Sequence, residues 1–407
     1  MKKMISIILI TIMSVTALTG CGTLREEKYD LTKVSDSVIS GNNDFAFRIF
    51  QVLNKEDEEQ SIFLSPFSIS AALTMTYNGA ETSTKEAMEK VLGFTGIDRA
   101  AINESYKNLI NYLGQMDKKV ELNIGNSIWI KEGQVIKEEF IKGNENNFNA
   151  EVDTLDFSDS SAADTINGWI SDATKDKIDK MIEPPIPADV IMYLINAIYF
   201  KGEWSEQFDP ERTYSDSFHK ADGSEQTVDM MNRSGLVEYA SGDYGKAVRL
   251  PYGDGKSSMY LMLPQEGTDI NGWINSMTID QWENIRNSVT ETEDVRLIIP
   301  RFKLEYGIKN LNDSLAALGM EEAFGTEADF SGIRDGIYIS RVLHKAVIEV
   351  NEEGSEAAAA TVVEIQESAA TEPISFVADR PFVFFITEDT TDTILFMGKV
   401  LDIGIEQ

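Results

Sequence analysis

The apolar residues of this chain change their spacing along the sequence, and the change restricts the folds that it can adopt. In residues 45–53 they recur at the spacing of one buried helix face, and Asn43 or Asp44 can cap that helix. Further helices are expected at residues 68–77, 82–92, 165–181 and 308–318. The first part of the chain is therefore expected to be mainly helical.

Strand patterns replace the helical spacing later in the chain. In residues 120–130 the apolar side chains fall on even positions, as in a strand with one buried face. Residues 191–200 are almost wholly apolar, as expected for a strand buried on both faces. Further strands are expected at residues 295–299, 346–350, 381–386 and 393–400. Helices early and strands late predict a mixed α+β fold with large, mainly antiparallel sheets.

Charge and composition exclude several classes of function. The chain has 68 acidic and 36 basic residues, which argues against a nucleic-acid partner because phosphate binding needs an excess of Lys and Arg. One cysteine cannot build a thiolate zinc site, and His219 and His344 alone leave little room for a histidine metal centre. Zinc-protease, phosphate-loop and Gly-x-Ser-x-Gly motifs are absent from the sequence. We therefore expect no metal and no cofactor, and no sequence motif indicates enzymatic activity.

Residues 1–20 are expected to form a lipoprotein signal peptide. Lys2 and Lys3 precede an apolar run of about 15 residues, which is shorter than the roughly 20 that a membrane-spanning helix needs. The run ends in LTGC at residues 18–21, which resembles a bacterial lipobox, where the signal is cut before the cysteine and the thiol receives a lipid. An ordinary secretory signal with an accidental cysteine is the alternative.

The lipid assignment sets the expected organisation and location. Residues 21–37 would comprise the lipidated Cys21 and a tether, because they carry mixed charges and no sustained apolar period. Residues 38–407 are expected to form a single domain, since no repeat, low-complexity tract or linker divides them. The protein would then be exported and either anchored at the outer face of a bacterial membrane or extracellular.

Residues 352–366, with the sequence EEGSEAAAATVVEIQ, combine two patterns. The four alanines at 357–360 favour a helix. From residue 355 onward, however, the odd and even positions differ. The odd positions (355, 357, 359, 361, 363 and 365) are all small or apolar, and every charged or amide side chain of residues 355–366 falls on an even position. A strand with this pattern can bury one face without burying a charge, and Gly354 allows a change of direction before it. The pattern alone leaves a surface loop, a short helix and an inserting strand open.

Ordered motifs along the chain resemble signatures of the serpin family. They include SIFLSPFSI at 61–69, NAIYFKGEW at 196–204, IPRF at 299–302, DRPFVF at 379–384 and FMGKV at 396–400. Such matches run in order from about Asn42 to Ile405, and residues 352–366 are similar to the family's hinge and reactive-centre loop. The chain thus resembles a bacterial lipoprotein member of the serpin family.

The resemblance implies an α+β serpin fold with three β-sheets, about nine helices and an exposed reactive-centre loop. It also implies a suicide-substrate inhibitor of serine proteases or, less often, cysteine proteases. The protease cuts the loop and forms a covalent acyl-enzyme, and the loop then inserts into the central sheet as a new strand. The implied partners are a target serine protease and, through lipid on Cys21, a membrane, and the protein is expected to be a monomer.

The resemblance also implies roles for individual residues. The hinge corresponds to Glu352, Gly354, Ser355, Ala357, Ala358, Ala359, Ala360 and Thr361. The shutter beneath the opening strands corresponds to Ser65, Ser68, Asn196 and His344, where a hydrogen-bond network is expected to change on insertion. The breach corresponds to Trp204 and Arg301, and Arg301 is expected to pair with Glu352. His344 as a catalytic base is the weaker interpretation.

The reactive bond follows from the family's register. Counting 17 residues from Glu352 places it between Ser368 and Ala369, and Glu367 is the rival P1 residue. Residues 366–370 contain no basic or aromatic side chain, which disfavours trypsin-like and chymotrypsin-like targets. The small residues suit a subtilisin-like or elastase-like protease, whereas a cut after Glu367 would suit a glutamate-specific one.

A serpin-fold surface lipoprotein that binds a partner or has a structural role without inhibiting is the alternative function. Non-inhibitory members tend to carry bulky or charged hinge residues, whereas residues 357–361 are all small. This composition favours inhibition.

Overall fold

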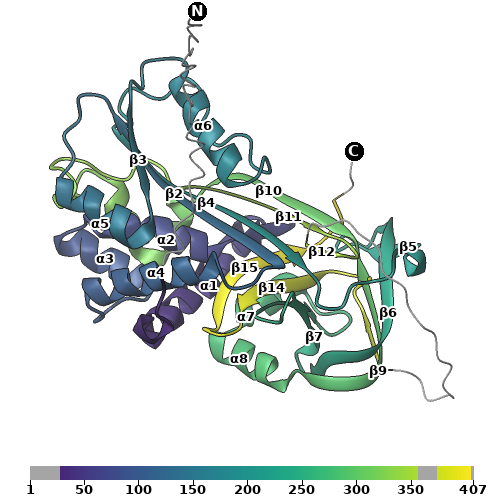
Figure 1. Ribbon diagram of the computed structural model, residues 1–407. Helices are drawn as coiled ribbons and strands as arrows, with labels where there is room; N and C mark the ends of the chain where they lie inside the picture. The colour runs from purple at the N-terminus through teal and green to yellow at the C-terminus, as the bar shows by residue number, and fades with distance from the viewer. Residues whose placement is uncertain (1–27, 356–373, 405–407) are drawn as a thin grey trace, which may run out of the picture.

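The computed structural model describes residues 28–355 and 374–404 (Figure 1). The expected signal peptide, Cys21, the hinge residues from Ala357 to Thr361 and the candidate reactive bond lie outside these residues. The helices are α1 (Asp36–Glu56), α2 (Pro66–Tyr77), α3 (Thr82–Leu92), α4 (Arg99–Leu113), α5 (Glu138–Phe148), α6 (Ala162–Ala173), α7 (Ile270–Ser276), α8 (Ile279–Ser288) and α9 (Asn312–Leu315). The strands are β1 (Ile62–Leu64), β2 (Val120–Lys131), β3 (Glu151–Leu155), β4 (Met192–Glu203), β5 (Tyr214–His219), β6 (Glu225–Gly242), β7 (Gly245–Tyr252), β8 (Ser257–Leu263), β9 (Thr290–Pro300), β10 (Phe302–Asn310), β11 (Leu343–Val350), β12 (Gly354–Ser355), β13 (Ser375–Val377), β14 (Phe382–Glu388) and β15 (Thr393–Val400).

The described part of the chain has an α+β architecture with nine α-helices and three sheets. The largest sheet has nine strands in the order β1-β15-β14-β8-β7-β6-β9-β13, with β5 paired to β6. A second sheet has the order β12-β4-β2-β3, and the third consists of β10 and β11. Helix α2 contacts both β4 and β15, so it connects the second sheet to the largest one. The expected fold class is confirmed.

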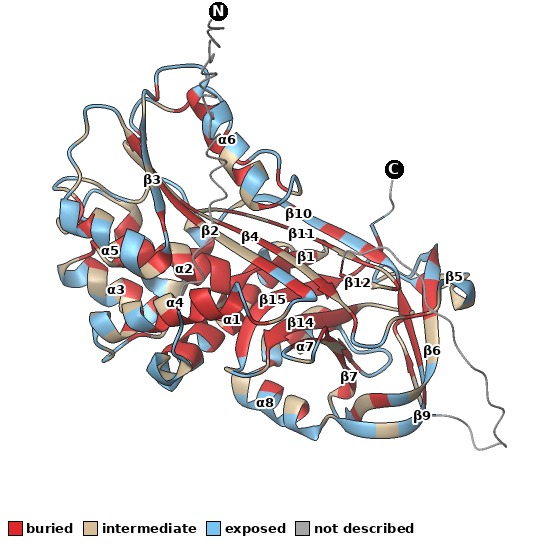
Figure 2. Cartoon of the chain, in the orientation of Figure 1, coloured by how far each residue is buried: buried red, intermediate tan, exposed pale blue. Residues whose placement is uncertain are grey.

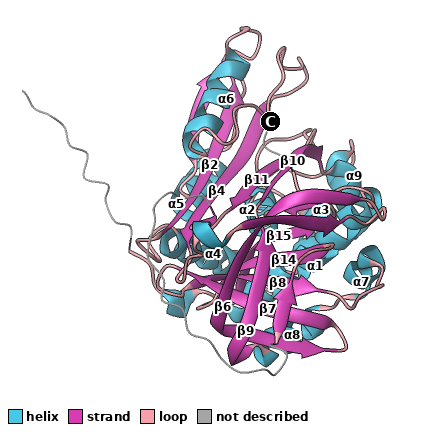
Figure 3. Cartoon of the chain, turned by 90° about the vertical axis from the view of Figure 1, so that its right-hand side faces the viewer, coloured by secondary structure: helices cyan, strands magenta, loops and turns pink. Residues whose placement is uncertain are grey.

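The main core lies between the largest sheet and the N-terminal helices. Every residue of β14 and β15 is buried, and α1 and α2 cover β15 (Figure 2). Phe385 of β14 packs edge-on against Phe47 and Phe50 of α1. A smaller core lies under α6, which stands apart from the other helices at the far end of β2 and β4 (Figure 3).

Helix α1 begins earlier than the sequence pattern predicts. Its N-cap is Ser35, and the buried Val38 and Ile39 extend its apolar face toward the N-terminus. Asn43 does not cap the helix; its side chain is buried and donates a hydrogen bond of 2.8 Å to the carbonyl oxygen of Asp392. The predicted cap was wrong because a polar residue on the buried face was taken for a helix end.

Two other predicted helices are shorter in the structure. The helix predicted at 165–181 ends at Ala173, and Lys175 and Asp176 adopt positive φ angles of 52° and 62°, which a helix does not allow. The start of the helix predicted at 308–318 belongs to β10, where Asn310 pairs with Leu343 of β11. Strand pairing overrides the local spacing there, because short apolar runs suit either element.

Residues 28–37, which were expected to belong to a tether, lie in the described part of the chain. The backbone nitrogen of Asp30 donates to Asn108 Oδ1 at 2.7 Å, and Lys33 pairs with Glu104 at 2.6 Å, so this segment lies along α4. Tyr29 packs edge-on against Tyr112 at the end of the same helix. None of the helices in the described ranges is long and apolar enough to span a bilayer.

Candidate functional site

Strands β4 and β11 present facing edges that do not pair with each other within the described residues. Strand β4 pairs with β2 along its length on one side, and on the other side, among the described residues, it pairs only with the two residues of β12. Strand β11 pairs with β10 on one side and contacts β12 on the other. Strand β12 therefore lies at one end of the gap between β4 and β11, two strands that do not pair with each other in the described ranges (Figure 1).

A cavity of about 280 Å³ lies at the other end of this gap. Its lining comes from β4, β11, the segment before β11 and α2 beneath them, and includes Ser68, Asn196 and His344. Residues 192–194 of β4, which were expected to be buried on both faces, are only half-buried because the cavity lies against them.

The four predicted shutter residues are joined by hydrogen bonds beneath this gap. The backbone nitrogen of Ser65 donates to His344 Nε2 at 3.1 Å, and Ser65 Oγ donates to the carbonyl oxygen of Leu395 at 2.7 Å. Ser65 Oγ also accepts from the backbone nitrogen of Ser68 as the N-cap of α2, and Ser68 Oγ donates to Asn196 Oδ1. The network thus links α2 to β15 and to both strands that border the gap.

His344 takes part in this network as a neutral acceptor. Its side chain is buried, and burial lowers the pKa of His344 to about 4. An imidazole that accepts a hydrogen bond at Nε2 must carry its proton at Nδ1, so protonation would remove the acceptor for Ser65.

Asn126 extends the shutter network, although the sequence analysis did not select it. It pairs with Asn196 across β2 and β4, and Asn196 Nδ2 donates to Asn126 Oδ1 at 2.6 Å. Asn126 Nδ2 in turn donates to the carbonyl oxygen of Phe148 at 2.7 Å. The sequence does contain a sign of this role, because Asn126 is a polar residue among the apolar even-numbered positions of its strand.

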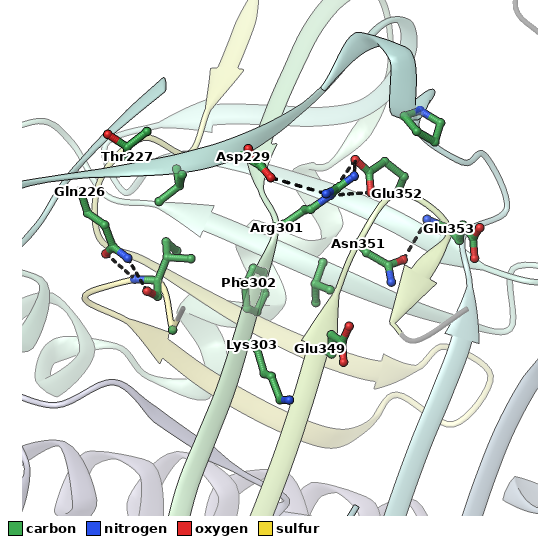
Figure 4. Close-up of a pocket in the computed structure, with 15 residues that line it drawn as sticks. Gln226, Thr227, Asp229, Arg301, Phe302, Lys303, Glu349, Asn351, Glu352 and Glu353 are labelled. Atoms are coloured by element: carbon green, nitrogen blue, oxygen red, sulfur yellow. Dashed lines mark hydrogen bonds and ion pairs between the residues drawn. The ribbon is translucent and has the colours of Figure 1, made fainter. Parts of the chain in front are cut away.

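A second cavity of about 550 Å³ lies where β11 ends, beside residues 351–353 (Figure 4). Arg301 points between Asp229 and Glu352 there, and its Nε lies 2.7 and 2.8 Å from the two carboxylate oxygens of Glu352. Thr213 Oγ1 also donates to Glu352, whose side chain is only 5% exposed. Burial raises the pKa of Glu352, but the hydrogen bonds from Arg301 and Thr213 outweigh it, so the pKa lies below its usual range.

Residues 351–353 are held by backbone and indole hydrogen bonds from the segment that follows β4. The backbone nitrogens of Trp204 and Phe208 donate to the carbonyl oxygens of Glu353 and Glu352, both at 2.8 Å. Trp204 Nε1 donates to the carbonyl oxygen of Asn351 at 2.9 Å. Trp204 and Arg301, the two predicted breach residues, therefore both bind the turn at residues 351–353.

Strand β12 lies against β4 at very short range. Gly354 pairs with Glu203, and a Cβ atom on Gly354 would lie 1.9 Å from the carbonyl oxygen of Gly202. Only glycine permits this approach. Ser355 pairs with Gly202 in the same antiparallel register and is buried.

Comparisons with known proteins agree with this geometry. The model of the family described as "Serpin (serine protease inhibitor)" matches residues 40–403. The chain belongs to the serpin family. An uncharacterized serpin-like protein of Methanosarcina acetivorans is 36% identical over 92% of this chain and 90% of its own length. Iripin-2 of Ixodes ricinus is 34% identical over 92% and 94%.

The crystal structure of the thermophilic serpin tengpin in its native state superposes with a TM-score of 0.81 at 31% sequence identity, covering 93% of this chain and 96% of tengpin. The family is one of protease inhibitors rather than catalytic enzymes, so proteases are the partners that it implies. In the described ranges, no group of three or more His, Cys, Asp or Glu side chains could hold a metal ion.

The structure brings the predicted serpin residues together in two groups at opposite ends of one gap. Ser65, Ser68, Asn196 and His344 lie at the end with the smaller cavity, and Trp204, Arg301, Glu352, Gly354 and Ser355 lie at the other. Thr213, Asn126 and the buried Tyr252, which contacts Ser355, were not predicted as site residues. Tyr252 lies in LPY at 250–252, which resembles a serpin motif, but its partner Ser355 is remote in sequence, and so is the partner of Thr213.

Proposed function

We propose that this serpin is a suicide-substrate inhibitor of extracellular serine proteases. The single observation that carries the proposal is that β4 and β11 do not pair with each other in the described residues, while β12 already pairs with the end of β4 beside the gap between them. A chain that continues from Ser355 in the same register would fill this gap. An edge strand with unpaired backbone groups favours such an addition.

The proposed reaction consists of a cut followed by a trap. The serine Oγ of the protease attacks the carbonyl carbon of the P1 residue, the P1–P1′ amide bond breaks, and the leaving nitrogen takes a proton. The resulting ester joins the protease to the loop. An inserted strand of 14 residues, from Ser355 to Ser368, would span about 46 Å at about 3.3 Å per residue. Insertion would thus carry the ester toward the far end of the sheet and distort the attached protease before water can hydrolyse the ester.

Side-chain parity supports insertion of this segment. Ser355 already faces inward, and the residues of the same parity, at 357, 359 and 361, are small. Burial of a charge at these positions would oppose insertion. The side chains at the even positions, such as Ala358 and Ala360, would remain on the solvent side of the sheet.

The target protease is proposed from residues 366–370. With Ser368 and Ala369 at the reactive bond, the small side chains suit a subtilisin-like or elastase-like enzyme. Glu367 as P1 would instead suit a glutamate-specific protease. We also propose that lipid on Cys21 anchors a monomeric inhibitor at the outer face of a bacterial membrane, because residues 18–21 resemble a lipobox.

The test is incubation of the protein with subtilisin and, separately, with elastase, followed by denaturing electrophoresis. We expect a band that survives denaturant, with the mass of the protease plus the inhibitor up to its P1 residue, because denaturant releases the C-terminal polypeptide. The variant Ala359→Arg should give mainly cleaved protein, because the arginine would have to be buried on insertion. The matched control Ala360→Arg should still form the complex, because the side chain at residue 360 would face solvent in the inserted strand. Simple cleavage of the parent by both enzymes and by a glutamate-specific protease would favour a non-inhibitory surface lipoprotein.

A further inference from the structure

Ser355 is the last residue described before the loop, yet it is 1% exposed. Its hydroxyl lies 2.7 Å from the hydroxyl of Tyr252, which is 0% exposed. Among the described residues, neither hydroxyl has another hydrogen-bond partner. Loss of either hydroxyl would therefore leave the other buried and unpaired.

The ring of Tyr252 is held in a fixed orientation at the end of β7. It stacks on Trp204 with a centroid distance of 4.5 Å and an angle of 13°, and it meets Phe200 edge-on at 5.0 Å. Gly202 lies directly over the ring, since a Cβ atom there would be 2.7 Å from Tyr252 Cδ1. The hydroxyl thus marks one defined place at the end of the gap.

The register of β12 is the register that an inserted strand would use. Ser355 pairs with Gly202, and Gly354 pairs with Glu203, antiparallel to β4. A strand continuing from Ser355 would pair with successively earlier residues of β4, whose edge is otherwise unpaired in the described residues. The contact between Tyr252 and Ser355 therefore does not have to break when the strand grows.

We propose that Tyr252 is a positioning residue for loop insertion, and that its hydroxyl holds Ser355 as the first residue of the inserted strand before a protease arrives. This proposal rests on the proposed function. Insertion competes with hydrolysis of the ester that joins protease and loop. Starting from a strand pair that is already formed removes the slow step of ordering the first residues, because later residues add to an existing pair.

The proposal predicts a specific partition between trapped and cleaved products. Removing one buried, neutral hydrogen bond changes an equilibrium by about fivefold. We expect Tyr252→Phe and Ser355→Ala each to raise the ratio of cleaved protein to covalent complex with subtilisin by about fivefold. The double variant should show no further increase, because both substitutions remove the same bond. Tyr106→Phe, which removes an equally buried hydroxyl bonded to Asn42, should leave the ratio unchanged.

Hydrogen exchange without protease provides a readout that does not depend on inhibition. Exchange of the backbone amides at 351–355 and 202–204 should be faster in Tyr252→Phe than in the parent, and unchanged in Tyr106→Phe. An unchanged product ratio in Tyr252→Phe, or additive effects in the double variant, would overturn the role of Tyr252. Absence of any covalent complex with the parent would refute the proposed function instead. In that case, unchanged hydrogen exchange in Tyr252→Phe would separately refute the role of the contact between Tyr252 and Ser355.

Discussion

Acidification should weaken this serpin through His344. The imidazole has a pKa of about 4 in the folded protein, against 6.5 for an unperturbed histidine, because it is buried. Between these values the unfolded chain binds a proton that the folded chain does not bind. The free energy of unfolding is therefore unaffected by His344 above pH 6.5, and it falls as the pH drops from 6.5 toward 4.

The magnitude follows from the two pKa values. Each unit of difference corresponds to about 1.4 kcal/mol, so His344 should lower the free energy of unfolding by about 2 kcal/mol at pH 5 and by about 3 kcal/mol at pH 4. Protonation also removes the acceptor for the backbone nitrogen of Ser65, which connects α2 to β11. The same change should thus loosen the shutter on one side of the gap.

Urea unfolding of the parent and of His344→Gln at pH 7, 6 and 5 tests this reasoning. The amide oxygen of Gln can accept the bond from Ser65 but has no proton to gain in this range. The parent should lose about 2 kcal/mol more than the variant between pH 7 and pH 5, a comparison in which the contributions of carboxylates cancel. Parallel pH profiles for the two proteins would refute the assignment of His344 as a buried neutral acceptor.

Two further predictions concern the other end of the gap. Arg301→Met should lower the free energy of unfolding by about 2 kcal/mol, because Glu352 loses its charged partner in a largely buried site, and urea midpoints would measure this loss. Adding Glu352→Gln should restore part of it, and equal losses in single and double variants would contradict the pairing. Gly354→Ala should separate β12 from β4, because its Cβ atom would lie 1.9 Å from the carbonyl oxygen of Gly202. Faster amide exchange at residues 202–204 would reveal the separation, and unchanged exchange would show that the short approach is not required.

Several elements with simple periods were predicted from the sequence, whereas β7, α8 and helices with polar residues on their buried faces were not. The strands predicted at 120–130 and 393–400 lie within or coincide with β2 and β15. Helices α4 and α5 were not predicted. Helix α4 buries Ser105, Asn108 and Asn111, which interrupts the apolar spacing on which such predictions depend.

In the candidate site, too, some residues could be predicted from the sequence and others could not. Motifs shared with the serpin family selected His344 and Glu352, because their neighbours in sequence carry the resemblance. The contact between Tyr252 and Ser355 joins residues 103 positions apart and depends on how β7 approaches β4. Such a contact is fixed by tertiary packing, so the local pattern around Pro251 and Tyr252 could not reveal it.

The wholly buried strands β14 and β15 determine what a cut in the loop leaves behind. Both follow residues 356–373 in the chain, and both pair inside the largest sheet, with β1 and β8 on their outer sides. A chain cut in that segment would consist of two polypeptides that remain one folded body. Size-exclusion chromatography under native conditions would therefore not register the cut, and the C-terminal polypeptide would separate only in denaturant.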